Sequence, residues 1–336
     1  MIQDTEAFLA ERAGRSEARL SSFRRSLLAH MGDAPGLLGG HTSVYATGSG
    51  GRGELSEHSD LDVFVVRRHK PASTLDAVQI QAAIVRALSD TGFPPPSRDG
   101  AFLRMHTSES LVGNIGKPED DAENTFTARM LLLLESRPIA GTAYDGILLD
   151  VVSAYWKNYE LHPADYLPIV LVNDIVRYWR ILLLNYESKN VERERELPAT
   201  HIKAERRLRS YKLRFSRCTT CYSALLALLA LSKRHGHVKA EDVLAMVREA
   251  PTTRLARVAR SFAEDAELGE LVADMRARYA EFLRETGQSK DALDRLFSDP
   301  VHRRARLAEG DAFGDLVFSL VARLGEKNRL YRYLVV

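Results

Sequence analysis

Apolar side chains recur at two different spacings along this chain. From about Thr5 to Met31 they follow a helical period with charged residues between them, which predicts one opening helix or a pair of helices. The stretch STLDAVQIQAAIVRALSDTG has the same period, with Ser73 or Thr74 as a possible cap and Gly92 at its end. Helices are therefore expected in both places.

Three shorter stretches are typical of strands. SVYATGSGG predicts a short strand that ends in a loop, LDVFVVRR a buried strand, and AFLRMHT a further strand. The intervening FPPPSRDG is expected to be a loop, because consecutive prolines continue neither a helix nor a strand. Strands and helices in this order predict a small α/β (α+β) domain with a mixed sheet.

Beyond Asp120 the strand signals vanish and the long segments all have helical periodicity. The pattern loosens in RPIAGTAYDG, which places a boundary between about Ile139 and Asp145. We therefore expect an α/β domain over residues 1–140, including the opening helix, and an all-helical domain over residues 141–336.

Composition changes this picture little. Of 336 residues, 45% are hydrophobic and 27% charged, as in ordinary globular proteins, and the formal charge of +2 is too small to indicate nucleic-acid binding by itself. The two cysteines, Cys218 and Cys221, are more typical of helix packing than of a metal or disulfide site. Without a signal-like start or an unbroken apolar run of roughly 20 residues, a cytoplasmic protein without a membrane partner is expected.

The candidate chemistry is concentrated in GSGGRGELSEHSDLDVFVV, residues 48–66. Asp60 and Asp62 are two residues apart at the start of a predicted strand, so their side chains are expected on one face. Two neighbouring carboxylates repel each other unless a cation lies between them, and oxygen ligands suit Mg²⁺. Two such ions can hold the attacking and leaving oxygens of a nucleotidyl transfer.

The turn that precedes these acids favours an anion. Gly48 and its neighbouring glycines leave backbone amides accessible to a phosphate, and Ser49 adds a hydroxyl donor. A P-loop would need a Gly-Lys-Ser/Thr ending, and a dinucleotide site would need its acidic residue about 20 residues further on. The alternative is a glycine hairpin beside a solvated acidic loop.

This stretch resembles the signature of the DNA polymerase β-like nucleotidyltransferases, and its Arg-Gly-Glu variant is most similar to the bacterial uridylyltransferases that modify signalling proteins. LLLLESRPIAG at 131–141 is similar to a segment that follows the catalytic domain of those enzymes. The resemblance covers roughly residues 44–141 at most and implies a mixed-sheet catalytic domain, Mg²⁺, and a nucleoside triphosphate as substrate. With the boundary predicted above, we expect the catalytic domain over 1–140 and a helical nucleotide- or substrate-binding domain over 141–336. The resemblance also implies phosphate binding by Gly48 and Ser49 and metal binding by Asp60 and Asp62.

Members of this superfamily usually have a third carboxylate on a later strand. AFLRMHT contains none, and the nearest acid is Asp99, just before it. Asp99 completes the metal site or simply forms the turn before Gly100, and His106 is a second candidate base. If neither serves, the protein is a nucleotide-sensing regulator that binds without turnover.

Polar residues in the helical half offer further candidates. Asn173, Arg177 and Arg180 form one line on an otherwise apolar helix, where the arginines need an anion such as a triphosphate or a protein carboxylate. Between residues 193 and 217 Lys and Arg outnumber Glu, which indicates a solvated basic face or a surface for RNA or an acidic protein.

The resulting hypothesis is a Mg²⁺-dependent nucleotidyltransferase that transfers a nucleoside monophosphate to a protein hydroxyl and releases pyrophosphate. Arg52 is a further candidate for the triphosphate. By a looser resemblance, so are Lys212 and Ser216, one helical turn apart. An RNA end, such as that of tRNA, is the alternative acceptor.

Overall fold

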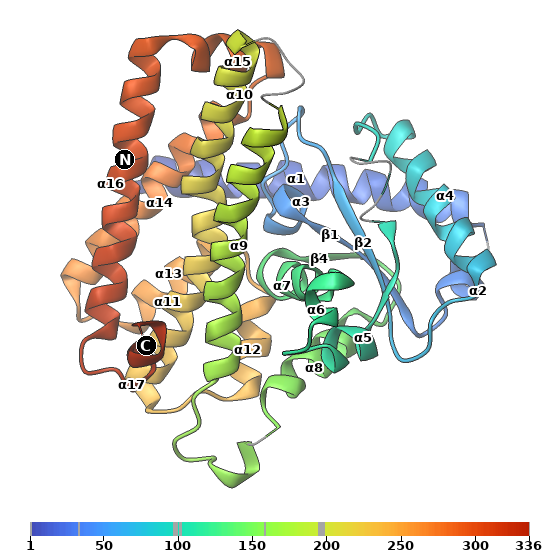
Figure 1. Ribbon diagram of the computed structural model, residues 1–336, viewed down its shortest axis with the longest axis horizontal. Helices are drawn as coiled ribbons and strands as arrows, with labels where there is room; N and C mark the ends of the chain where they lie inside the picture. Colours follow the sequence, from blue (N-terminus) through green and yellow to red (C-terminus); the bar gives the residue numbers. More distant parts are fainter. Residues whose placement is uncertain are drawn as a thin grey trace. The chain divides into compact units, whose positions relative to one another are not determined.

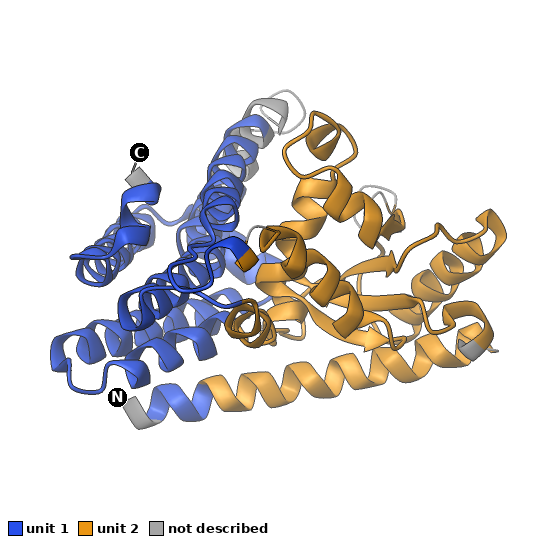
Figure 2. Cartoon of the chain, turned by 90° about the horizontal axis from the view of Figure 1, so that it is seen from below, with its two compact units in different colours: residues 1–8, 161–239, 251–336 blue, residues 9–160, 240–250 orange. Residues whose placement is uncertain are grey.

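The computed structural model describes residues 2–32, 34–96, 100, 103–157, 159–193 and 199–335. The chain is mostly helical and contains one small mixed sheet, so an α+β class fits (Figure 1). It forms two compact units: residues 1–8, 161–239 and 251–336 make unit 1, and residues 9–160 and 240–250 make unit 2 (Figure 2). The predicted domain boundary after residue 140 stays a prediction.

The sheet belongs to unit 2 and has the strand order β3-β2-β1-β4. Strand β1 (Thr42–Thr47) is antiparallel to β2 (Asp62–Arg67) and to β4 (Arg137–Ala140), whereas β3 (His106–Thr107) is parallel to β2. Strands β1 and β2 are where the apolar pattern predicts them. In the described part of AFLRMHT, only the last two residues form a strand.

Strand β4 shows that one expectation is wrong, because a strand does follow residue 120. It lies inside RPIAG, where a short pattern containing Pro138 gives no alternation to detect. Pro138 is opposite Tyr45 at one edge of the sheet, a position where the missing amide of proline is tolerated.

The two faces of the sheet have different roles. Val44, Ala46, Val63 and Val65 pack against helices α1 (Ile2–Met31) and α4 (Thr74–Asp90) in one apolar core. On the opposite face the rings of Tyr45 and Phe64 stack 6.0 Å apart. Since Asp62 has the same parity as Phe64, its side chain lies on this second face.

Helix α4 confirms the prediction from its periodicity and cap. The Ser73 hydroxyl accepts a hydrogen bond from the amide of Asp76, and the helix ends just before Gly92, which has a φ of +70°. The opening segment is one helix, α1. The remaining helices of unit 2 are α2 (Ala34–Leu38), α3 (Gly48–Arg52), α5 (Ser108–Gly113), α6 (Glu119–Ala122), α7 (Thr125–Glu135), α8 (Tyr144–Tyr155) and α12 (Ala240–Val247).

Unit 1 is helical over its described residues. Its helices are α9 (Ile169–Arg193), α10 (Ala199–Lys212), α11 (Cys218–His235), α13 (Pro251–Ser261), α14 (Ala266–Thr286), α15 (Lys290–Ser298), α16 (Pro300–Gly325) and α17 (Arg329–Val335). A π-helical turn, Leu213–Arg217, joins α10 to α11. Helix α11 is the apolar centre of the unit and packs against α9, α13 and α16.

The cysteines and the apolar helices agree with a packed interior. Cys218 and Cys221 are buried and form no disulfide, and burial raises the pKa of Cys218 to about 12. Only the stretch Ala204–His235 is long and apolar enough to cross a bilayer in the described part of the chain, and 83% of its apolar window is buried inside the protein. A buried core helix of a soluble protein fits this finding, while a cytoplasmic location stays a prediction.

Candidate functional site

The glycine turn directly follows the buried strand β1. Its first residue, Gly48, has a φ of +60°, a conformation that L side chains rarely adopt, and it opens the short helix α3. The turn closes through hydrogen bonds from the amide of Gly53 to the carbonyl of Gly50 (3.2 Å) and from the amide of Glu54 to that of Ser49 (2.8 Å). Ser49 is half-buried, so its hydroxyl lies near the surface.

The structure brings this turn and Asp62 together. Thr47 and Asp62 are opposite each other in the β1–β2 register, so the first residue of the turn is next to the start of β2. A Cβ atom on Gly48 would lie 3.1 Å from Oδ2 of Asp62. Glycine at this position therefore allows both the backbone conformation and the close approach of the carboxylate.

The loop that leads to the acids is held by helix α1. The Nε of Arg12 donates to the carbonyl of Glu54 (3.0 Å), and the guanidinium of Arg19 donates to the carbonyl of Ser56. Ser56 and Ser59 then close a turn, with the Ser56 amide donating to Oγ of Ser59 at 2.9 Å. Asp60 follows this turn and is exposed to solvent.

Asp60 and Asp62 differ in their surroundings. Leu61 between them is buried, and Asp62 is partly buried on the sheet face opposite α1 and α4. One carboxylate thus belongs to a loop and the other to the first residue of a strand. The strand position limits the movement of Asp62 more than the loop limits that of Asp60.

Arg52 has a different environment from the one predicted for a phosphate ligand. Its Nε donates to the Glu54 carboxylate at 2.7 Å, and its Nη1 donates to the carboxylate of Glu135, the last residue of α7. All three side chains are buried, at 7%, 6% and 2% exposure. Arg52 as a triphosphate ligand stays a prediction, although in this structure two carboxylates already bind its guanidinium.

This buried cluster explains the Arg-Gly-Glu segment and was missed at the sequence level. Glu54 could have been found as a partner two residues from Arg52, but nothing in the sequence indicates Glu135. Gly51 is part of the same contact, since a Cβ there would lie 1.8 Å from the carbonyl oxygen of Glu135. Gly51 therefore serves close packing against α7, whereas Gly48 faces a carboxylate.

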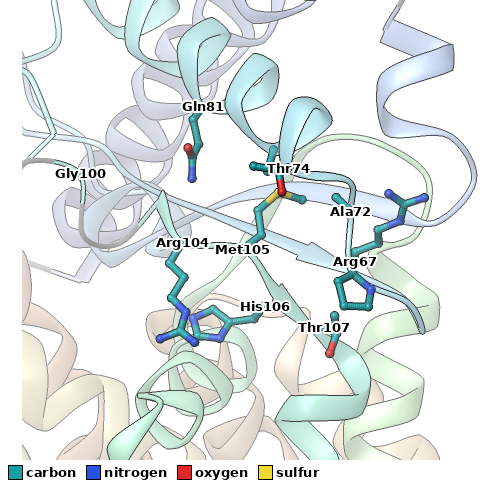
Figure 3. Close-up of a pocket in the computed structure, with 11 residues that line it drawn as sticks. Arg67, Ala72, Thr74, Gln81, Gly100, Arg104, Met105, His106 and Thr107 are labelled. Atoms are coloured by element: carbon teal, nitrogen blue, oxygen red, sulfur yellow. The ribbon is translucent and has the colours of Figure 1, made fainter.

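The region expected to supply the third carboxylate is only partly described. Asp99 lies outside the described residues, so its role stays a prediction. Where the chain enters β3, Met105 is directed toward Thr74 of α4, whereas Arg104 and His106 point to the opposite side of the chain (Figure 3). His106 is opposite Val66, four residues beyond Asp62, which corresponds to roughly 13 Å along the sheet.

His106 does not fit the role of a base at the acid pair. Direct proton transfer requires hydrogen-bonding distance, far less than that offset. His106 is 7% exposed and makes no hydrogen bond to any residue that the structure describes. Burial, followed by nearby Arg104, lowers its pKa to about 4 against a weaker opposite effect of Glu123, so the ring is neutral at pH 7.

A cavity of about 450 Å³ lies at the β3 edge of the sheet. Its walls include Arg67 at the end of β2, Thr74 on α4, and Gln81, which donates to the carbonyl of Leu103 at 2.9 Å (Figure 3). Arg67 is five residues beyond Asp62, roughly 16 Å along the strand. We therefore do not assign this cavity to the glycine–aspartate site.

Candidates from the helical half belong to unit 1. Arg177 on α9 is partly buried, Lys212 ends α10 and is exposed, and Ser216 is buried in the π-helical turn. Lys212 and Ser216, expected on one line of a regular helix, thus differ in exposure. Their roles at a site in unit 2 stay predictions. Two acidic residues that could have served as protein partners of these arginines are engaged within unit 2, Asp120 by Arg129 (2.6 Å) and Glu135 by Arg52.

The donor set can be compared with what Mg²⁺ requires. Within the described residues no group of three or more His, Cys, Asp or Glu side chains is arranged to hold a metal. Mg²⁺ nevertheless needs few protein ligands, because one or two carboxylates suffice when waters and substrate phosphates complete the octahedron. Asp62, with its Oδ2 close to the backbone of Gly48, fits that requirement, and Asp60 in the preceding loop is the candidate for a second ligand.

Comparison with known proteins identifies no family: no family model matches the chain, and no curated protein matches it. The likeness of the glycine–aspartate stretch to nucleotidyltransferases therefore remains a resemblance of motif. The function has to be argued from the geometry.

Proposed function

We propose that this protein is a Mg²⁺-dependent nucleotidyltransferase with a polymerase β-like catalytic domain. The observation that carries the proposal is the close approach of Asp62 to Gly48, which brings a phosphate-type glycine turn and a metal-type carboxylate to one place. The β1–β2 register alone would bring these two positions together, so the proposal rests on their chemistry: a glycine at one position and a carboxylate at the other.

In this proposal different residues bind the phosphates and the metal. Backbone amides of Gly48 and Ser49, with the Ser49 hydroxyl, bind the outer phosphates of a nucleoside triphosphate. Asp60 and Asp62 hold Mg²⁺, which when bound supplies positive charge beside the phosphate oxygens. The Arg52 cluster holds the turn in shape, because both of its carboxylates are buried next to α3.

The proposed reaction is transfer of a nucleoside monophosphate. The oxygen of an acceptor hydroxyl forms a bond to the α-phosphorus, the bond from the α-phosphorus to the α–β bridging oxygen breaks, and pyrophosphate leaves. The hydroxyl proton passes to a base or to water. A protein side chain is the acceptor that the motif resemblance favours.

The test uses the full chain with each α-³²P-labelled nucleotide, Mg²⁺ and a cell lysate. We expect label in protein and a loss on the order of 10³-fold in an Asp60→Asn/Asp62→Asn variant, because several kcal/mol of charge stabilisation disappear. Glu57→Gln is the matched control, an exposed acid of the same loop. Transfer that persists in the double variant at the control rate would refute the proposal, and label in RNA would reassign the acceptor.

A nucleotide-sensing regulator is the second candidate. It is favoured by the segment AFLRMHT, which leads into β3 and contains no carboxylate. The sensor predicts Mg²⁺-dependent nucleotide binding that the double variant loses, together with no label in any acceptor. Binding and transfer measured on one preparation separate the two functions.

A further inference from the structure

A second cavity, of about 370 Å³, lies within unit 1 where α10 packs beside α15 and α16 (Figure 1). Its floor includes the buried ring of Tyr211 and the buried Phe297, and half-buried Tyr186 of α9 is on its wall. Five guanidinium groups line it, from Arg206, Arg207, Arg214, Arg303 and Arg306. This cavity gathers part of the basic segment noted in the sequence and adds arginines from α16.

Carboxylates neutralise only part of this charge. Asp311 binds Arg214, and a Glu285 oxygen lies 3.1 Å from Nε of Arg306. The same Glu285 oxygen is 2.8 Å from Nε2 of His302, so it is shared. The cavity wall therefore has more cations than the acids that contact it can balance.

Of the three remaining arginines, Arg206 is exposed and interacts with a further group, whereas Arg207 and Arg303 are not balanced by acids. Arg207 donates from Nη1 to the carbonyl oxygen of Phe297 at 2.8 Å, a neutral acceptor. Arg303 makes no side-chain hydrogen bond or ion pair with any residue that the structure describes. An arginine that lines a cavity without a protein acceptor can direct its donors to a ligand.

Arg207 and Arg303 are also close enough to repel each other. Burial and then the nearby charge of Arg303 lower the pKa of Arg207. Like charges held together cost free energy unless an anion lies between them. The arrangement is therefore unfavourable in the free protein and favourable with an anion bound.

We propose that this cavity binds a small ligand that carries two or more phosphate groups, with Arg207 and Arg303 as its central phosphate contacts. Guanidinium groups match phosphate oxygens in a two-pronged geometry, so several of them together select polyphosphates over single anions. The volume suits a small molecule rather than a strand or a protein surface. This site goes beyond the proposed transfer reaction, since all its lining residues are in unit 1 and none is in the glycine turn or the aspartate pair.

The test is titration calorimetry of the full chain with inorganic tripolyphosphate in the presence of EDTA. Arg303→Gln is compared with Arg304→Gln, the adjacent exposed arginine that does not line the cavity. We expect Arg303→Gln to weaken binding about tenfold or more, and Arg304→Gln to change it by less than about twofold. Equal losses in the two variants, or no binding by the unaltered protein, would overturn the proposal.

Two further measurements separate this site from its alternatives. Asp60→Asn/Asp62→Asn should leave the Arg303-sensitive binding unchanged, and its loss there would place the ligand at the glycine turn instead. A single-stranded oligoribonucleotide that binds more tightly than tripolyphosphate, with the same dependence on Arg303, would overturn the small-ligand assignment in favour of RNA. Weaker oligoribonucleotide binding supports the small ligand.

Discussion

Arg52 and Arg303 are the same residue type in two opposite electrostatic situations. Arg52 in unit 2 is buried between the carboxylates of Glu54 and Glu135, whereas Arg303 in unit 1 is exposed beside Arg207 and lacks a carboxylate partner in the described chain. A buried charge must have its partners within the protein, because leaving it unpaired costs several kcal/mol. Exposed guanidinium groups without a carboxylate partner remain solvated and can bind an anion from solution.

This difference gives a rule for assigning functions to the arginines of this protein. The sequence motif predicts Arg52 as a phosphate ligand, whereas in the structure two buried carboxylates bind its guanidinium. Arg207 and Arg303, which line a cavity and lack acidic partners among the described residues, are in the helical unit, where the sequence shows only a general basic excess. Whether an arginine has carboxylate partners within the protein, rather than its position in a motif, is therefore the criterion by which we distinguish arginines that hold the structure from arginines that bind a ligand.

The substitution expected to have the largest effect on the packing around the Arg52 cluster is Gly51→Ala. Its new methyl group would meet the backbone carbonyl of Glu135, which a flexible side chain cannot relieve. We expect a loss of unfolding free energy on the order of 5 kcal/mol, measured by urea denaturation. Gly113→Ala is the control, because a Cβ there meets nothing within 4 Å. Equal stability of the two variants would contradict the described packing.

Removal of the Arg52 charge tests the pairing itself. Arg52→Met removes the cation that binds the buried carboxylates of Glu54 and Glu135, and we expect a loss of about 3–5 kcal/mol in unfolding free energy. The variant Arg52→Met/Glu54→Gln/Glu135→Gln removes the charges together and should recover part of that loss. A single variant as stable as the native protein would show that Arg52 is not neutralised by these acids and is available to a ligand.

His106 provides a third situation, a buried ionisable group without an ion-pair partner among the described residues. Its pKa falls from 6.5 to about 4 through burial and Arg104, so the unfolded chain takes up the proton at higher pH than the folded protein. The stability gained from a neutral His106 is complete above pH 6.5 and is lost as the pH falls toward 4. We expect about 2–3 kcal/mol of this dependence.

The measurement for His106 is the unfolding free energy between pH 7 and pH 4 in native protein, His106→Gln and His58→Gln. The native protein and the exposed control His58→Gln should lose more stability than His106→Gln over this range. Parallel curves for all three proteins would mean that His106 titrates normally in the folded state.

The smallest expected effect concerns the surplus charge in unit 1. Arg303→Gln removes repulsion with Arg207 and should raise the unfolding free energy by less than about 0.5 kcal/mol at low salt, with the gain disappearing at high salt. Thermal denaturation at two salt concentrations measures it. A destabilisation of several kcal/mol would make Arg303 a structural residue like Arg52 and remove the contrast between them.

Prediction from sequence was best where one element carries its own signal. Helix α4 is predicted by the helical spacing of its apolar residues and by the capping residue Ser73, and strands β1 and β2 are predicted by their runs of β-branched and aromatic residues. Strand β4 could not be found, because four residues including Pro138 show no alternation and become a strand only by pairing with β1. Short edge strands depend on their neighbours more than on their own sequence.

The candidate site shows the same limit. The proximity of Gly48 and Asp62 follows from two adjacent antiparallel strands, so the local pattern predicts it. The partner of Arg52 at Glu135 depends on where α7 ends in space, and the approach of Arg207 to Arg303 depends on the packing of α10 beside α16. Contacts between residues about 80 to 100 positions apart have no local signature.

The π-helical turn Leu213–Arg217 has a consequence for how unit 1 is organised. Relative to an unbroken α-helix, it inserts one peptide unit and so offsets the angular phase of all that follows by about 100°. Helix α10, before the turn, contributes arginines to the lining of the 370 Å³ cavity, and α11, after the turn, contributes alanine and leucine side chains to the interior of unit 1. Deletion of a single residue in this turn would rotate α10 relative to α11 about the helix axis. The direction in which the arginines of α10 point relative to the apolar side chains of α11 therefore depends on the number of residues in the turn as well as on the side chains.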